Sequence, residues 1–90
     1  MKKRDRLKVI YDILNIIKQN KNSIKPTPLL RYSNLSSQSF LEYFKELKDR
    51  KLIKEAKDKK DKKFITLTDK GFEYLEKYRV ITGFIEEFEL

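Results

Sequence analysis

The sequence of 90 residues contains no cysteine and no histidine, and it has only two glycines and two prolines. Without cysteine there is no disulfide framework and no thiol nucleophile, and without histidine as well the usual zinc sites of small domains are excluded. Histidine acid–base chemistry is excluded too. The carboxylate pairs Asp58/Asp61 and Glu86/Glu87 fall in segments that we expect to be exposed. We therefore expect no enzyme, no metal site, no cofactor and no small-molecule ligand.

Long apolar runs are also missing. No stretch approaches the roughly 20 apolar residues of a membrane-spanning helix. The segment after the basic N-terminus is interrupted by Asp12, Asn15 and Lys18, so it lacks the apolar centre of a signal peptide. With no export signal and no disulfides, the expected location is the cytoplasm.

The charge is strongly positive and unevenly placed. The chain has 22 Lys and Arg against 14 Asp and Glu, a net charge of +8. Residues 1–63 have 19 basic and 8 acidic residues (+11), whereas residues 64–90 have 3 and 6 (−3). A basic domain of this size usually meets an anionic partner, and nucleic acid is the commonest one.

Apolar spacing predicts the first helix, over about residues 4–20. One stripe at helical spacing consists of Leu7, Ile10, Leu14 and Ile17, and a second consists of Val9, Ile13 and Ile16. A helix with two apolar stripes is expected to pack on two sides, against its own domain and against something else.

Capping and turn residues predict two further helices close together. Thr27 followed by Pro28 is typical of a helix start, and Ser33-Asn34 is typical of a turn. Ser36 is a second N-cap candidate, for a helix to about residue 50. Its buried face is expected to consist of Phe40, Tyr43, Phe44 and Leu47. A short helix, a tight turn and a longer helix form the outline of a helix-turn-helix.

The second half of the chain predicts a β-hairpin and a long helix. Residues 51–54 and 64–68 have strand propensity, and they flank a Lys-rich loop over 57–63. Thr68-Asp69 is expected to cap a last helix that runs nearly to Leu90. Phe72 and Leu75 are expected to complete the core.

The order of these elements is that of a mainly α fold with a β-hairpin wing, a winged helix-turn-helix with a long C-terminal helix. The sequence resembles archaeal winged-helix regulators of the ArnR-like type, whose relatives include small basic dimeric DNA-binding proteins of archaeal chromatin. The resemblance rests on residues 27–36, Tyr43-Phe44, Leu47, Lys51-Leu52-Ile53 and the LT-x-x-G-x-x-x-L motif over 67–75. The family usually has glycine where this chain has Lys51, at a left-handed turn that lysine adopts with modest strain.

The resemblance implies a DNA interface. In a helix-turn-helix the second helix lies in the major groove, with its N-terminal part against the base edges. The helix over 36–50 would read DNA, and the wing over 57–63 would contact the phosphate backbone. The candidate DNA-binding residues are Arg31, Ser36, Ser37, Gln38, Lys45, Lys57, Lys59, Lys60 and Lys62. Lys2, Lys3, Arg4 and Arg6 are further candidates for phosphate contact.

The reading helix offers several kinds of contact. Gln38 can make a bidentate contact to adenine, and Lys45 can reach guanine or phosphate. The serines at the helix tip suit a phosphate, because N–H and hydroxyl groups point outward there. Glu42 and Asp49 lie on the same face and would repel phosphate, although Glu42 can accept from a cytosine amino group. The alternative is that Gln38 and Lys45 only solvate a surface helix.

The last helix carries an apolar seam with coiled-coil spacing, which predicts a dimer interface. The seam residues are Tyr74, Tyr78, Ile81, Phe84, Ile85 and Phe88. Acidic residues crowd the C-terminal end, so an antiparallel pair is favoured over a parallel one. The alternative is that this helix folds back onto the Val9, Ile13 and Ile16 stripe.

Together these features predict two parts, a winged DNA-binding domain over residues 1–71 and a dimerisation helix over 72–90. The leading hypothesis is a homodimeric transcriptional regulator that binds double-stranded DNA with sequence preference, located in the cytoplasm with the nucleoid. The alternatives are a non-specific architectural chromatin protein and a winged-helix module for protein–protein interaction.

Overall fold

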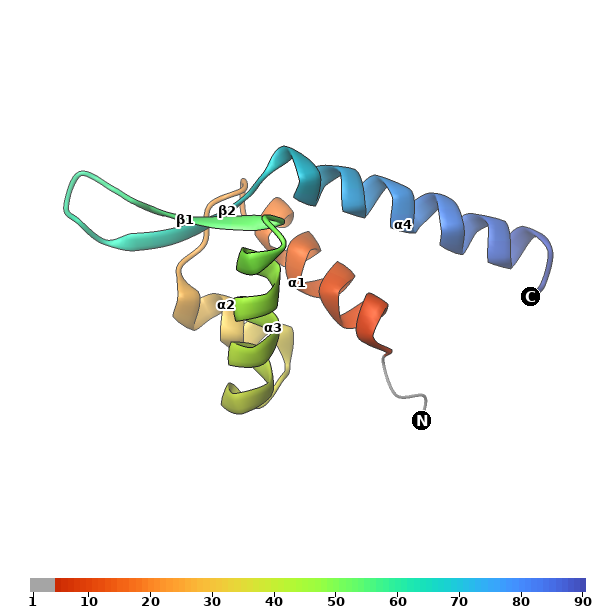
Figure 1. Cartoon of the computed structure of the whole chain (residues 1–90), viewed down its shortest axis with the longest axis horizontal. Coiled ribbons are helices and arrows are strands. Elements are labelled where there is room, and N and C mark those ends of the chain that lie inside the picture. Colours follow the sequence, from red (N-terminus) through yellow and green to blue (C-terminus); the bar gives the residue numbers. More distant parts are fainter. Residues whose placement is uncertain (1–4) are drawn as a thin grey trace.

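The computed structural model describes residues 5–90, which form four helices and one hairpin. In chain order these are α1 (Arg6–Gln19), α2 (Pro26–Ser33), α3 (Ser37–Asp49), β1 (Ile53–Lys57), β2 (Lys63–Leu67) and α4 (Asp69–Glu87). The first three helices and the base of the hairpin form one body (Figure 1). The hairpin tip extends from one side of this body and α4 from the other. The predicted mainly α fold with a hairpin wing is confirmed.

The core lies around α1. Asp5 caps this helix by accepting a hydrogen bond from the Lys8 N–H at 2.7 Å. Residues of both predicted stripes are buried, and α1 packs against α2, β2 and α4, which all belong to this chain. The prediction was wrong for Leu7, which is 57% exposed because it lies in the first turn, beyond the packed region. The fully buried large side chains are Ile13, Leu14, Ile17, Leu29, Leu47 and Ile65.

The start of α2 differs from the prediction. Lys25, not Thr27, is the N-cap residue, and Pro26 is the first helical residue. The backbone of Lys25 is extended, which the following proline favours. Both prolines lie in the first turn, where their missing N–H groups would have no partner in the helix anyway.

The turn between α2 and α3 forms as predicted. Asn34 ends α2 in the left-handed conformation, with φ 58°. The Ser36 hydroxyl accepts a hydrogen bond from the Ser39 N–H at 3.2 Å and caps α3. These local bonds fix where α3 begins and therefore which residues form its tip.

The hairpin begins later than predicted, because a left-handed turn comes first. Lys51 has φ 61°, which confirms the conformation expected where the family has glycine. The Leu52 N–H then donates to the Leu47 carbonyl at 2.9 Å, which satisfies one of the free carbonyls at the end of α3. The first strand therefore covers Ile53–Lys57, not 51–54, and pairs antiparallel with Lys63–Leu67.

A third segment joins the sheet, and the sequence did not predict it. Ile24 forms an isolated antiparallel bridge with Ile65 through two backbone hydrogen bonds of 3.2 and 2.7 Å. Next to it, the Asn22 side-chain oxygen accepts from the Leu67 N–H at 2.6 Å. These bonds attach the α1–α2 connection to the base of the wing.

Thr68 and Gly71 explain the LT-x-x-G motif. The Thr68 hydroxyl accepts from the Gly71 N–H at 3.1 Å and donates to the Lys51 carbonyl at 2.6 Å. A Cβ atom on Gly71 would lie 2.3 Å from the Leu52 carbonyl oxygen, so only glycine fits here without a shift. The motif therefore anchors the start of α4 to the turn after α3.

Only the first half of α4 packs on the body. Leu75 is buried, but Phe72 is 38% exposed, so its predicted place in the core was wrong. The Tyr74 hydroxyl donates to the Leu7 carbonyl at 2.9 Å, and the Tyr78 ring stacks on Tyr11 with centroids 4.6 Å apart. The C-terminal part of α4 extends away from the body (Figure 1). Within residues 5–90, none of the helices combines the length and apolar character needed to cross a membrane.

Candidate nucleic-acid interface

The outer face of α3 carries the residues that the sequence assigned to DNA. Gln38 and Lys45 are exposed, as are Glu42 and Asp49 beside them. On the opposite face Phe40 and Leu47 are buried, and Tyr43 and Phe44 are partly buried. Ser36 and Ser37 are exposed at the tip. The predicted division of α3 into a buried and an exposed face is confirmed.

Sequence reasoning missed Leu41 on this helix. It follows Gln38 by three residues and precedes Lys45 by four, so the three share one side of α3. Leu41 is 62% exposed, whereas the other apolar residues of α3 are buried or partly buried. The signal was present in the spacing, because Leu41 does not fall on the predicted buried face.

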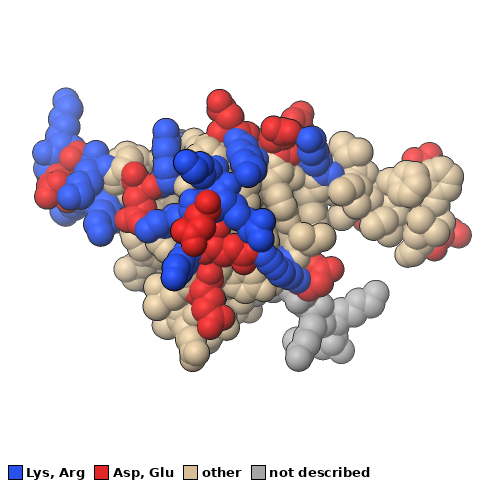
Figure 2. Space-filling model, in the orientation of Figure 1, with Lys and Arg blue, Asp and Glu red and all other residues tan. Residues whose placement is uncertain are grey.

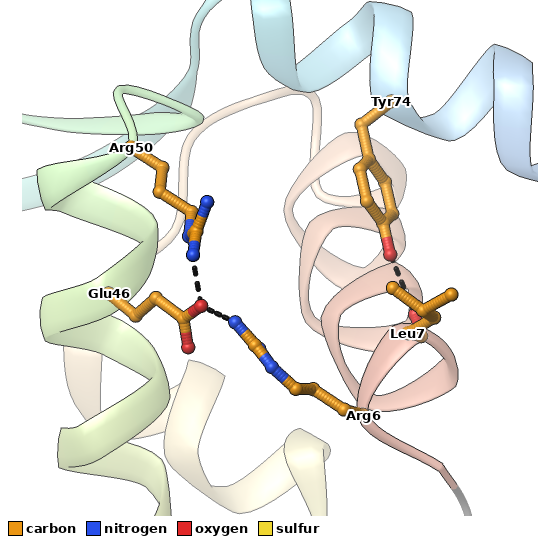
Figure 3. Close-up of polar contacts among 5 residues, drawn as sticks. All are labelled: Arg6, Leu7, Glu46, Arg50 and Tyr74. Atoms are coloured by element: carbon orange, nitrogen blue, oxygen red, sulfur yellow. Dashed lines mark hydrogen bonds and ion pairs between the residues drawn. The ribbon is translucent and has the colours of Figure 1, made fainter.

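Glu46 forms ion pairs with two arginines. It accepts from Arg50 Nε at 2.9 Å and forms an ion pair with Arg6, so it links α1 to α3 (Figure 3). Arg6, a candidate for phosphate contact, is therefore already paired. Lys48 is likewise paired, with Glu55 on β1. The pairs of Glu46 with Arg6 and of Lys48 with Glu55 join different elements, and the sequence did not predict them. The pair of Glu46 with Arg50 is a local contact four residues along the chain.

The wing tip is a turn organised by Asp58. Its carboxylate accepts hydrogen bonds from the Lys60 and Lys62 N–H groups at 2.8 and 3.0 Å. The Asp58 carbonyl also accepts from the N–H of Asp61, a residue with φ 64°. Asp58 therefore builds the turn from which the lysines extend.

The wing lysines differ in their ion pairs. Lys57 lies 3.4 Å from Asp61, and Lys63 lies 3.9 Å from Glu55. Lys59, Lys60 and Lys62 are exposed and, among the described residues, form no ion pair. Lys54 on β1, which sequence reasoning did not select, is exposed and likewise forms no ion pair with any described residue.

The remaining candidates are more dispersed. Arg31 on α2 is exposed and forms no ion pair within residues 5–90. Lys45 on α3 is likewise exposed and forms no ion pair with any described residue. Lys2, Lys3 and Arg4 lie outside the described residues. The wing tip and the tip of α3 point to different ends of the body (Figure 1). Lys and Arg gather at the wing, whereas the far end of α4 shows only acidic charges (Figure 2).

The seam residues of α4 fall into two groups. Tyr74 and Tyr78 are partly buried against α1, and burial raises the pKa of Tyr74 to about 12, so its hydroxyl remains a donor to Leu7. The other four seam residues are 40–58% exposed, and we call them the distal stripe: Ile81, Phe84, Ile85 and Phe88. Gly83 lies beside them, and a Cβ atom placed on it would have no neighbour within 4 Å among the described residues.

Within residues 5–90, no group of three or more acidic side chains is placed to hold a metal ion.

Comparisons with known proteins agree with this architecture. The family model described as winged helix-turn-helix matches residues 3–86. A search of curated proteins found no match. The chain is similar to Sso10a-2, a DNA-binding protein from Sulfolobus solfataricus, with a TM-score of 0.75 and 15% identity, over 96% of this chain and 86% of that one.

A second similar structure is F93 from STIV, a winged-helix DNA-binding protein. The TM-score is 0.74 and the identity 22%, over 89% of this chain and 91% of that one. At these identities, the similarity to the two structures is evidence for the fold alone. The family match spans nearly the whole chain. The chain therefore belongs to the winged helix-turn-helix family.

Proposed function

We propose that this protein binds double-stranded DNA as a homodimeric transcriptional regulator, with α3 in the major groove and the wing on the phosphate backbone. The observation that carries the proposal is the wing tip. There Asp58 holds a turn from which three lysines extend, without an ion pair to any described residue, on the hairpin of a winged helix-turn-helix. The proposal is also supported by the two similar structures, because Sso10a-2 and F93 are both DNA-binding proteins.

The wing would supply most of the affinity. Lysine is a point charge, so Lys59, Lys60 and Lys62 would contact phosphates without reading sequence. Each phosphate contact releases counterions, and five to eight contacts per subunit would give a log–log salt slope of about −5 to −7. Arg31 and Lys45 would add contacts from the body of the domain.

α3 would supply the sequence preference. Gln38 would read adenine, Lys45 would reach guanine or phosphate, and the exposed tip at Ser36 and Ser37 would dock a phosphate. Glu42 and Asp49 reduce the attraction of this face for the backbone. Because of these acidic residues, affinity and specificity are expected to come from different elements, the wing and α3.

The C-terminal helix over residues 72–90 would make the dimer, through the distal stripe. An exposed apolar stripe of this length is unusual on a soluble monomer, and pairing would bury it. An antiparallel pair would place the acidic end at Glu86 and Glu87 near basic residues of the partner's helix, such as Arg79. A dimer of this kind would present two α3 helices to a pseudo-palindromic site.

The test is fluorescence anisotropy of a labelled random-sequence duplex, titrated with protein across a salt series. The wing variant carries Lys59→Glu and Lys60→Glu. A matched control with the same charge change carries Lys18→Glu and Lys21→Glu, at the end of α1. We expect micromolar or tighter binding that weakens steeply with salt, collapses in the wing variant and changes little in the control.

Equal losses in the two variants would show that only net charge matters and would contradict the assignment to the wing. No binding at low salt would contradict the DNA proposal itself. The exposed distal stripe would then favour a module for protein–protein interaction.

A non-specific architectural role is the second candidate, and the composition of α3 favours it. Its outer face holds one lysine that pairs with no described residue, two acidic residues and no arginine. A regulator should prefer a selected site over random DNA by several kcal/mol, whereas an architectural protein should not. Selection from a random duplex library, followed by competition with unselected DNA, separates the two roles.

A further inference from the structure

One apolar side chain lies among the polar residues of the outer side of α3. Leu41 is 62% exposed and lies one turn after Gln38 and one turn before Lys45. It borders a shallow hollow of about 190 Å³ between the starts of α2 and α3, whose walls are mainly apolar. The hollow is lined by Pro26, Thr27, Leu30, Ser37, Phe40 and Leu41.

The major groove offers one apolar group to such a side chain. Adenine, guanine and cytosine present hydrogen-bond donors and acceptors there, and thymine adds its C5-methyl group. Gln38, on the same side of α3, is suited to adenine. Where an adenine is paired with a thymine or lies next to one, the adenine edge suited to Gln38 and the thymine C5-methyl group suited to an apolar side chain lie in the same groove.

From this placement we propose that Leu41 is a specificity-determining residue that contacts the C5-methyl group of thymine. The inference rests on the proposed function, because it requires α3 to lie in the major groove. Since Leu41 carries no charge, its contact adds base discrimination and leaves the number of phosphate contacts unchanged. The sequence preference of α3 is therefore toward A·T pairs.

The test uses two labelled duplexes of the same AT-rich sequence, one with thymine and one with uracil at every thymine position. The two differ only in the C5-methyl groups and have the same phosphates. Wild-type protein should bind the thymine duplex more tightly, by about fourfold for each methyl group buried, from the free energy of burying one methylene.

Leu41→Ala should bind both duplexes about equally and keep the wild-type salt slope. The matched control is Leu7→Ala, the same substitution at a residue of α1 that is 57% exposed. This control should keep the wild-type preference for thymine. Circular dichroism spectra of both variants check that they fold.

A wild-type protein that binds the two duplexes equally would overturn the inference and leave DNA binding intact. A Leu41→Ala variant that keeps the full preference for thymine would overturn it too. Failure of the wild type to bind either duplex at low salt would instead overturn the proposed function, and this inference with it.

Discussion

The two glycines of this chain lie in opposite surroundings on the same helix. A Cβ on Gly71 would meet the Leu52 carbonyl oxygen at 2.3 Å, and this backbone atom cannot move without shifting the turn after α3. A Cβ on Gly83 would have nothing within 4 Å among the described residues. One glycine is therefore required by close backbone approach, and the other is not required by any contact within residues 5–90.

Gly71→Ala is expected to destabilise the fold by about 1–3 kcal/mol, as overpacked substitutions do. Gly83→Ala is the matched control and is expected to stabilise the monomer by up to about 1 kcal/mol, since alanine favours the helix more. Urea unfolding followed by circular dichroism measures both. A Gly71→Ala protein as stable as the wild type would contradict the role given to the motif.

The wing contains an acidic residue that supports the turn carrying its lysines. Asp58 lowers the positive charge of the tip, yet its carboxylate accepts two of the backbone N–H groups that form the turn. Charge alone predicts that removing it would strengthen DNA binding. The geometry predicts the reverse, because a disordered tip loses more conformational entropy when it binds.

Asp58→Ala is therefore expected to weaken binding to a random duplex by about threefold to tenfold, within the range for ordering one or two side chains. Asp58→Asn keeps the side-chain oxygen and removes the charge, so it should bind at least as tightly as the wild type. Anisotropy titrations at one salt concentration compare them. Tighter binding by Asp58→Ala would mean that the turn needs no such support.

At the scale of the whole molecule, α4 has two environments. Its first half belongs to the core through Leu75 and to α1 through Tyr74 and Tyr78. Its second half extends beyond α1 and has no partner in the core among the described residues. The fold-back alternative placed this helix on the Val9, Ile13 and Ile16 stripe, whereas Tyr74 and Tyr78 of the first half contact Leu7 and Tyr11 of α1. Self-association remains the proposal for the second half.

Phe84→Glu combined with Phe88→Glu is expected to convert a dimer to a monomer, measured by sedimentation equilibrium. The fold should persist, because both side chains are more than half exposed. Val80→Glu is the control: Val80 is 71% exposed but lies off the predicted seam. A wild-type protein that is monomeric at high micromolar concentration would contradict the dimer proposal.

Features that depend on near neighbours could be predicted from the sequence. The caps at Ser36 and Thr68 were predicted correctly, because their hydrogen bonds involve residues only a few positions apart. The left-handed turn at Lys51 was expected from the family resemblance, since the family usually has glycine at this position. The exposed and buried faces of α3 followed from helical spacing alone. The family resemblance rests on these same local features.

Which charged and apolar side chains remain available depends on the tertiary packing. Arg6 is paired with Glu46 forty positions along the chain, Ile24 bridges to Ile65, and the Tyr74 hydroxyl reaches Leu7. Each of these contacts joins segments that are far apart in the sequence. Helical and strand spacing relate only near neighbours, so the sequence did not predict these contacts. Within residues 5–90, the tertiary packing leaves three wing lysines without an ion pair and only the distal half of α4 uncovered.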